Sequence, residues 1–153
     1  MSIFHSLNSS ASALTSQRLR MDVISSNMAN IDTTRGKMVD GEWQPYRRKS
    51  VSFQPKQGQF SNFLNVAMGT RDKGNIGNGV TVSRIQEDNE TPLKQVFDPA
   101  HPDANAEGYV EMPNVDPLRE TIDMMSATRS YEANITVLNS NKAMLMKALE
   151  IGK

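Results

Sequence analysis

Histidine lies among carboxylates at one place in this 153-residue chain, the segment that runs from Asp98 through His101 to Asp103. Histidine and aspartate can bind a divalent metal, or can exchange protons as a general acid and base. Prolines stiffen this segment, however, and the second histidine, His5, lies in a predicted helix with no reason to approach. We therefore expect a rigid turn whose aspartates accept backbone N–H groups, with no catalysis and no metal.

Two further strings could bind phosphate groups. The glycine-rich run Gly74–Gly79 lacks the Gly-Lys-Ser/Thr sequence and the strand–loop–helix context of a phosphate loop. The basic run Arg47, Arg48 and Lys49 is short, and the net charge of the chain is zero, which argues against nucleic acid as a partner. No nucleophile–base pair or Gly-x-Ser-x-Gly motif is present, so we expect no small-molecule substrate and no cofactor. We interpret the basic run as possible inter-subunit charge contacts.

Charge is unevenly distributed along the chain. Residues 33–56 contain six basic and two acidic side chains, whereas residues 85–123 contain ten acidic and two basic ones. Oppositely charged patches can pair within one chain, or they can join successive copies head to tail. Contacts of the second kind produce open helical filaments when the rotation between copies does not close.

The elements that must position these residues are two long helices, one at each end of the chain. Residues 3–30 and residues from Pro117 to about Glu150 have apolar positions three and four apart, and Asp116 is a good N-cap for the second helix. The expected packing positions are Leu7, Leu14, Met21 and Met28 at the N-terminal end, and Met124, Tyr131, Ile135, Leu138, Leu145 and Leu149 at the C-terminal end. The outer face of the first helix is small and uncharged between Ser6 and Gln17, which predicts either close packing there too or a segment that stays unfolded until it is packed.

Between the helices the pattern favours short strands. We expect a loop or extended arm over residues 31–45, strands at 46–53, 79–85, 93–97 and 109–112, and a mobile glycine-rich loop over 69–79. A short amphipathic helix is predicted at 60–68 from Phe60, Phe63, Leu64, Ala67 and Met68. The fold class is therefore α+β. Residues 1–31 and 115–153 would pair as a coiled coil, and residues 32–114 would form a small β-rich middle domain.

Composition points to assembly rather than to a self-sufficient core. Only 37% of the residues are hydrophobic and 6% are aromatic, so part of the apolar surface is expected to be covered between subunits. The chain has no cysteine, no apolar run long enough to cross a membrane, and no N-terminal pattern of a cleaved secretory signal. If the protein acts outside the cytoplasm, we expect it to leave by another route.

Several strings resemble those of flagellar axial proteins, the family of rod, hook and hook-associated subunits. They are Ser26–Asn30 with Asp32–Arg35, Pro45–Lys49, Phe97–Ala104, Glu107–Val110, Pro113–Val115, Arg129–Asn134 and Lys147–Leu149. The terminal strings are shared across axial proteins, whereas the middle Asp-Pro-x-His-Pro-Asp string is more specific and is similar to the proximal-rod subtype. Together they cover nearly the whole chain.

The resemblance implies a structural subunit of the proximal rod in the basal body of the bacterial flagellum, with no enzymatic activity. Its terminal helices would form the inner coiled-coil layer of an axial tube that transmits torque for motility. Export would use the flagellar type III apparatus without a cleaved signal, and assembly would occur in the periplasm or cell wall. The implied partners are other copies of the chain and other rod proteins (the FlgB, FlgF, FlgG and FliE types).

The resemblance also draws attention to four polar residues. Asn27 and Asn30 are expected to end the first helix, because asparagine tolerates the left-handed conformation and bonds nearby backbone. Tyr131 and Asn134 are expected to lie against the N-terminal helix or a neighbouring subunit. Three alternatives stay open: a different axial rod subunit, a soluble cytoplasmic coiled-coil adaptor, and, as a distant third, an enzyme with a metal at His101.

Overall fold

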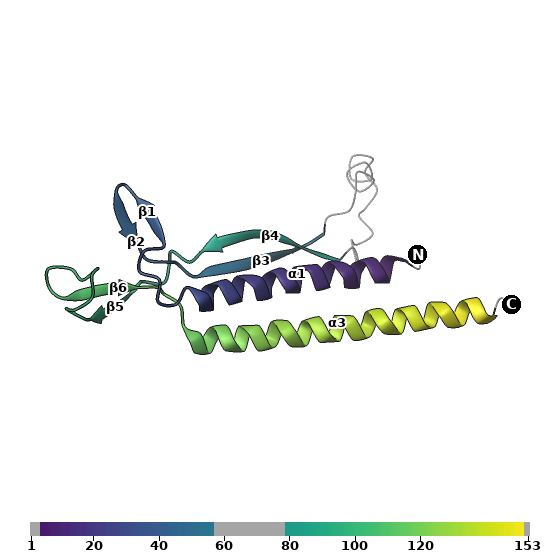
Figure 1. The fold of residues 1–153 in the computed structure, drawn as a ribbon. Helices are drawn as coiled ribbons and strands as arrows, with labels where there is room; N and C mark the ends of the chain where they lie inside the picture. Colours follow the sequence, from purple (N-terminus) through teal and green to yellow (C-terminus); the bar gives the residue numbers. More distant parts are fainter. Residues whose placement is uncertain (1–3, 57–78, 152–153) are drawn as a thin grey trace, which may run out of the picture. The chain divides into compact units, whose positions relative to one another are not determined.

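The computed structural model describes residues 4–56 and 79–151. Within these residues, one long helix lies near each end of the chain, and three two-stranded sheets lie between them in sequence (Figure 1). The α+β class is therefore confirmed. The predicted helix at 60–68 and nearly all of the glycine-rich run before Gly79 lie outside the described residues.

The two helices begin and end close to the predicted positions. Helix α1 spans Phe4–Ala29, and the Asn30 side chain then donates a hydrogen bond of 2.8 Å to the Ser26 carbonyl. Helix α3 spans Pro117–Ile151, and the Asp116 carboxylate accepts the Leu118 N–H at 3.0 Å, as an N-cap does. Neither helix in the described residues has an apolar stretch that could cross a membrane.

Strands β3 (Lys49–Pro55) and β4 (Val80–Glu87) form one sheet. The Lys56 N–H bonds the Gly79 carbonyl at one end, and the Asp88 N–H bonds the Arg48 carbonyl at the other, so the two strands run antiparallel. Strands β5 (Lys94–Phe97) and β6 (Tyr109–Met112) form a second antiparallel pair. These four strands confirm the predicted extended segments to within a few residues.

The expectation of a loop or extended arm over residues 31–45 was wrong for residues 37–44. Strands β1 (Lys37–Val39) and β2 (Glu42–Gln44) form a hairpin there, visible in Figure 1. Its two-residue turn has positive φ at both positions, 53° at Asp40 and 89° at Gly41, which is the backbone of a type I′ turn. Asp-Gly is a strong sequence signal for that turn, but strands of three residues are too short to show alternation.

The described residues form two compact units. The first unit contains residues 4–19, 53–56, 79–83 and 128–151, and the second contains residues 20–52 and 84–127. The division predicted from sequence, between terminal helices and a middle domain, stays a prediction.

In the first unit, the small face of α1 contacts the backbone at the start of β4. The Ser12 hydroxyl accepts the Val80 N–H at 3.1 Å, and the Ser16 hydroxyl donates to the Val80 carbonyl at 3.4 Å. A Cβ at Gly79 would clash with the Ser12 hydroxyl, and Gly79 also has a φ of 85°. The uncharged stretch of α1 therefore packs closely at Ser12 and Ser16, whereas Ser6, Asn8, Ala11 and Thr15 are exposed.

The second unit has a small apolar interior. Its buried hydrophobic residues are Val23, Ile24, Val110, Val115 and Ala127. Polar side chains fill the space beside them, and Asn27, Asn114 and Glu120 are all buried. Burying such groups is costly unless each one is hydrogen-bonded or paired, so their partners determine how this unit is held together.

Candidate assembly site

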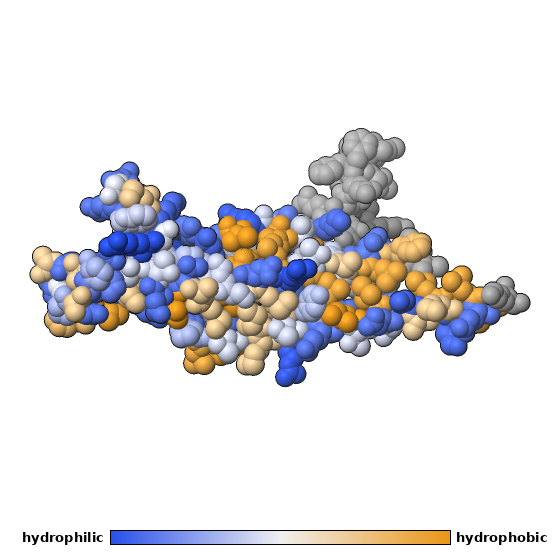
Figure 2. Space-filling view, viewed as in Figure 1, coloured by the Kyte–Doolittle hydropathy of each residue, from blue (hydrophilic) through white to orange (hydrophobic). Residues whose placement is uncertain are grey.

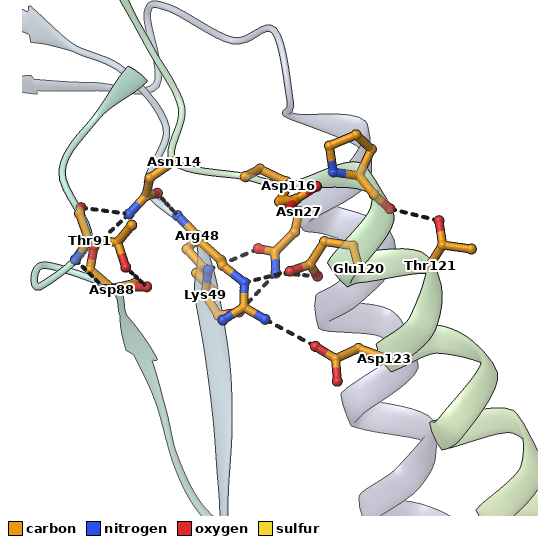
Figure 3. A network of polar contacts seen from close by, with 12 residues as sticks. Asn27, Arg48, Lys49, Asp88, Thr91, Asn114, Asp116, Glu120, Thr121 and Asp123 are labelled. Carbon is orange, nitrogen blue, oxygen red and sulfur yellow. Dashed lines mark hydrogen bonds and ion pairs between the residues drawn. The ribbon is translucent and has the colours of Figure 1, made fainter. Parts of the chain in front are cut away.

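Asn27 connects the last turn of α1 to the start of β3. Its side chain is 0% exposed and makes four hydrogen bonds, of which Figure 3 draws those to Lys49 and Glu120. The amide nitrogen donates to the Lys49 carbonyl at 2.8 Å and to Glu120 at 3.0 Å, while the amide oxygen accepts the Lys49 N–H and the Tyr46 hydroxyl, each at 2.9 Å. These four bonds use the full capacity of a primary amide.

Glu120 lies in the first turn of α3 and is also 0% exposed. One carboxylate oxygen accepts the Arg48 Nε–H at 2.5 Å, and the other accepts the Asn27 amide. The carboxylate also lies at a helix N-terminus, where the backbone dipoles favour a negative charge. A buried carboxylate is tolerated here because an arginine neutralises it and because both of its oxygens are bonded.

A second acidic residue extends the network along α3. Asp123 accepts an Arg48 Nη–H at 3.2 Å and an Arg20 Nη–H at 3.0 Å from α1. With Glu120, the cluster holds two positive and two negative charges, which balance. We call Arg20, Asn27, Arg48, Glu120 and Asp123 the polar junction, because they join residues 20–27 of α1, the start of β3 and the first turns of α3.

Asn114 joins the turn after β4 to the same region. Its oxygen accepts the Arg48 N–H at 2.8 Å, and its amide group donates to the Asp88 carbonyl at 3.0 Å and the Thr91 carbonyl at 3.1 Å (Figure 3). Thr91 donates its N–H and its hydroxyl to the Asp88 carboxylate, and these bonds hold the pKa of Asp88 below its usual range. Asp88 therefore keeps its charge further into the acidic range than an ordinary aspartate, and its bonds to Thr91 close the turn.

The segment from Asp98 to Asp103 forms a turn, as predicted. Asp98 accepts the Ala100 N–H at 3.1 Å, and the His101 ring accepts the Asp103 N–H at 3.1 Å. The Asp103 carboxylate instead bonds side chains, at 2.8 Å from Arg35 Nε and 2.8 Å from the Thr34 hydroxyl. Arg35 and Thr34 together lower the pKa of Asp103. No group of three metal-binding side chains gathers anywhere in the described residues.

Some of the predicted packing residues are half-buried and others are exposed. Leu7, Leu14, Met21, Met124, Tyr131, Asn134, Leu138 and Leu145 are half-buried, whereas Met28, Ile135 and Leu149 are exposed. The deepest positions of α1 are instead Ser10, Ser16, Val23, Ile24 and Asn27. The apolar heptad of α1 is therefore only partly covered within one chain. Whether these residues pack between subunits stays a prediction.

Two polar expectations need adjustment. Neither Asn27 nor Asn30 has a positive φ; Asp40 is the only residue other than glycine that does so among those described. Asn30 caps α1 by bonding Ser26, whereas Asn27 remains helical and bonds β3. Of the basic run, Arg48 points inward to Glu120, and the Lys49 ammonium lies 5.4 Å from the centre of the Tyr46 ring.

Glu120 was not singled out from the sequence, and its burial was not predicted. A signal was present, because Glu120 lies seven residues before Ala127 on one face of α3 and continues the inward series through Tyr131 and Asn134. In the polar junction, the side chain of Asn27 makes all four of its hydrogen bonds, and the charges of two arginines balance those of two carboxylates. This arrangement can fix the geometry between two helices and a strand, which is what a subunit of an ordered assembly needs.

Comparison with known proteins identifies the class. The family model described as "Flagella basal body rod protein" matches residues 7–36, and the model described as "Flagellar basal body rod FlgEFG protein C-terminal" matches residues 106–151. The two models together cover the end of α1 that carries Asn27 and all of α3, so they include most of the polar junction. The chain is thus one of the flagellar basal-body rod proteins.

Relatives that match the whole chain identify which family of rod proteins it belongs to. The chain is 64% identical over 153 residues to the flagellar basal-body rod protein FlgC of Bacillus subtilis, with 100% of both chains covered. It is 46% identical to FlgC of Borreliella burgdorferi over 162 residues, covering 99% of this chain and 98% of the relative. Identity to FlgC of Salmonella typhimurium is 40% over 153 residues, again covering 100% of both. The chain belongs to the FlgC family of flagellar basal-body rod proteins.

Proposed function

We propose that this chain is built into the rod through its terminal helices, which pack as a coiled coil with those of neighbouring subunits. As a member of the FlgC family, it serves as a structural subunit of the flagellar basal-body rod. The rod would be an axial tube that transmits torque, and the chain would carry load rather than catalyse a reaction.

The observation that carries the proposal is the apolar surface of α3. Figure 2 shows hydrophobic surface over the C-terminal part of this helix. The exposed apolar residues there are Ile135, Val137, Met144, Met146, Leu149 and Ile151. Leu149 is 75% exposed and Met144 is 62% exposed. At about 100° per residue, Ile135, Met146 and Leu149 lie on one side of α3, and Val137, Met144 and Ile151 lie on the other. Large apolar side chains that a helix leaves exposed are typical of a surface that another protein covers.

The finer parts of the proposal rest on the family. The names of the relatives place them in the basal-body rod, so the partners of this chain would be other copies and other rod proteins, of the FlgB, FlgF, FlgG and FliE types. Reaching the periplasm or cell wall would require export by the flagellar type III apparatus, without a cleaved signal peptide. Asn27 and Asn30 would act indirectly, by holding the end of α1 in the shape that assembly needs.

Lysine substitutions on α3 test the proposal. Met144→Lys with Leu149→Lys should leave the isolated chain folded, because both side chains are already exposed, but would bury two unpaired charges in the rod. We expect the amount of chain in purified basal bodies to fall by about tenfold or more, and motility with it. The helical circular dichroism of the purified variant should be unchanged.

Asn139→Lys is the matched control, since it adds a positive charge at an exposed polar position of the same helix. This variant should be incorporated like the original chain. If the double variant is incorporated normally, the C-terminal part of α3 is not an assembly surface. If the unmodified chain stays in the cytosol and never enters basal bodies, the adaptor hypothesis replaces the rod hypothesis.

A further inference from the structure

The second unit has a cleft whose walls combine aromatic rings with carboxylates. It has a volume of about 430 Å³ and is lined by residues of β2, β6 and the turn at 103–105. Trp43 and Tyr109 lie in its walls and are 53% and 42% exposed. Glu42 and Glu111 line the same cleft and are also exposed. We call this feature the acidic cleft.

Two of the three carboxylates that line the acidic cleft have no ion pair within the described residues. Its third carboxylate, Asp103, is already bonded to Arg35 and Thr34. Glu42 and Glu111 form no ion pair within residues 4–56 and 79–151. An indole face attracts cations more strongly than any other side-chain ring, and a nearby carboxylate adds to that attraction. The chemistry of the cleft therefore fits a lysine or arginine side chain.

A second cleft, of the opposite charge, is lined in part by Lys37 of β1 and Gln44 of β2. Its volume is about 220 Å³, and Lys37, Arg47 and Lys49 line it together with one acidic residue, Glu87. Pro45 lines both clefts. Arg48 does not contribute, because its charge is neutralised by Glu120 and Asp123. Lys37 and Arg47 form no ion pair within the described residues, so this basic cleft also lacks a partner.

We propose that the acidic cleft of one copy receives the side chains of Lys37 and Arg47 from the basic cleft of a second copy. This inference rests on the proposed function, because it names the neighbour that one surface of the rod subunit meets. In the proposed contact each copy offers its acidic cleft to one neighbour and its basic cleft to another, so the contact is heterologous. Repeating such a contact joins copies in an open row, which is the arrangement that a helical rod requires.

Crosslinking through introduced cysteines tests this contact in assembled basal bodies. The chain has no cysteine, so every thiol is placed by design. Two differently tagged chains, one with Glu42→Cys and one with Arg47→Cys, are expressed together and treated with a short bismaleimide. We expect a crosslinked dimer that carries both tags. Glu107→Cys is the control, because Glu107 is an exposed acid of the same unit that lines neither cleft.

The control pair of Glu107→Cys with Arg47→Cys should give at least about tenfold less dimer than the test pair. Equal yields from the two pairs, or no mixed dimer from the test pair, would overturn the proposal. Crosslinking of Glu42→Cys to a different rod protein would also overturn it, because the occupant would not be a second copy. These outcomes differ from failure of the proposed function, in which the tagged chains are absent from basal bodies altogether.

Charge reversal gives an independent readout. Glu42→Arg alone and Arg47→Glu alone should each lower incorporation into basal bodies by about tenfold, since each places like charges together across the contact. The chain that carries both substitutions restores opposite charges between successive copies. We expect its incorporation to return to within about twofold of the original chain. A double variant that is no better than the two single variants would contradict the pairing.

Discussion

Replacing Glu120 with alanine is expected to lower the free energy of unfolding of the second unit by about 3–5 kcal/mol. The carboxylate is fully buried and accepts hydrogen bonds from Arg48 and Asn27. Its removal leaves Arg48, whose side chain is mostly buried, with only the longer bond to Asp123. It also removes one partner of a buried amide, and the low-dielectric interior makes both losses expensive.

Urea unfolding of the purified chain measures this effect. The sequence contains one tryptophan, Trp43, which lies on β2 in the second unit and so reports on that unit. Glu132→Ala removes the same type of side chain from an exposed position of the same helix and should change stability by less than about 0.5 kcal/mol. A loss below about 1 kcal/mol for Glu120→Ala would show that the polar junction does not stabilise this unit.

Asn27→Leu should cost about 3 kcal/mol or more, although leucine has the same number and branching of side-chain heavy atoms as asparagine. The apolar side chain cannot bond the buried Glu120 carboxylate, nor the partly buried backbone of Lys49 and hydroxyl of Tyr46. Each polar group that is left unsatisfied when buried costs about 1–3 kcal/mol. The same urea experiment applies. Asn8→Leu, at an exposed position of α1, is the control and should have little effect.

The outcome of Asn27→Leu separates two roles for this residue. If Asn27 acted only by ending α1, leucine would extend the helix and the helical circular dichroism would rise while stability changed little. Because its amide is bonded to β3 and to Glu120, we expect a large loss of stability and no gain of helix. A stable variant with a longer helix would contradict the role that we assign to the polar junction.

Local sequence signals predicted the elements well. The apolar spacing of both ends, with Asp116 before Pro117, predicted α1 and α3, since helix faces and caps depend on neighbouring residues. Alternation of apolar and polar residues predicted β3 and β4, because the two faces of a strand also depend on neighbouring residues. The β1–β2 hairpin was missed because its strands are three residues long, so the Asp40-Gly41 turn was its only strong signal.

The polar junction was beyond sequence reasoning because its partners are far apart in the chain. Arg48 meets Glu120 across 72 positions, and Asn27 meets Glu120 across 93. The basic run containing Arg48 was interpreted as a surface for neighbouring subunits, but a single sequence does not reveal which of three adjacent cations turns inward. The resemblance to axial proteins was more informative about function, because it depended on short sequence motifs and not on knowing which side chains meet in the fold.

Amide hydrogen exchange, measured on the purified chain and on the chain in isolated basal bodies, tests most directly whether assembly completes this fold. Amides of residues 20–27 and 120–127, which carry the polar junction, should be protected in both states. Amides of residues 135–151, which carry the exposed apolar surface of α3, should exchange readily in the purified chain and become protected in the rod. Equal protection of residues 135–151 in the two states would contradict assembly through the terminal helices.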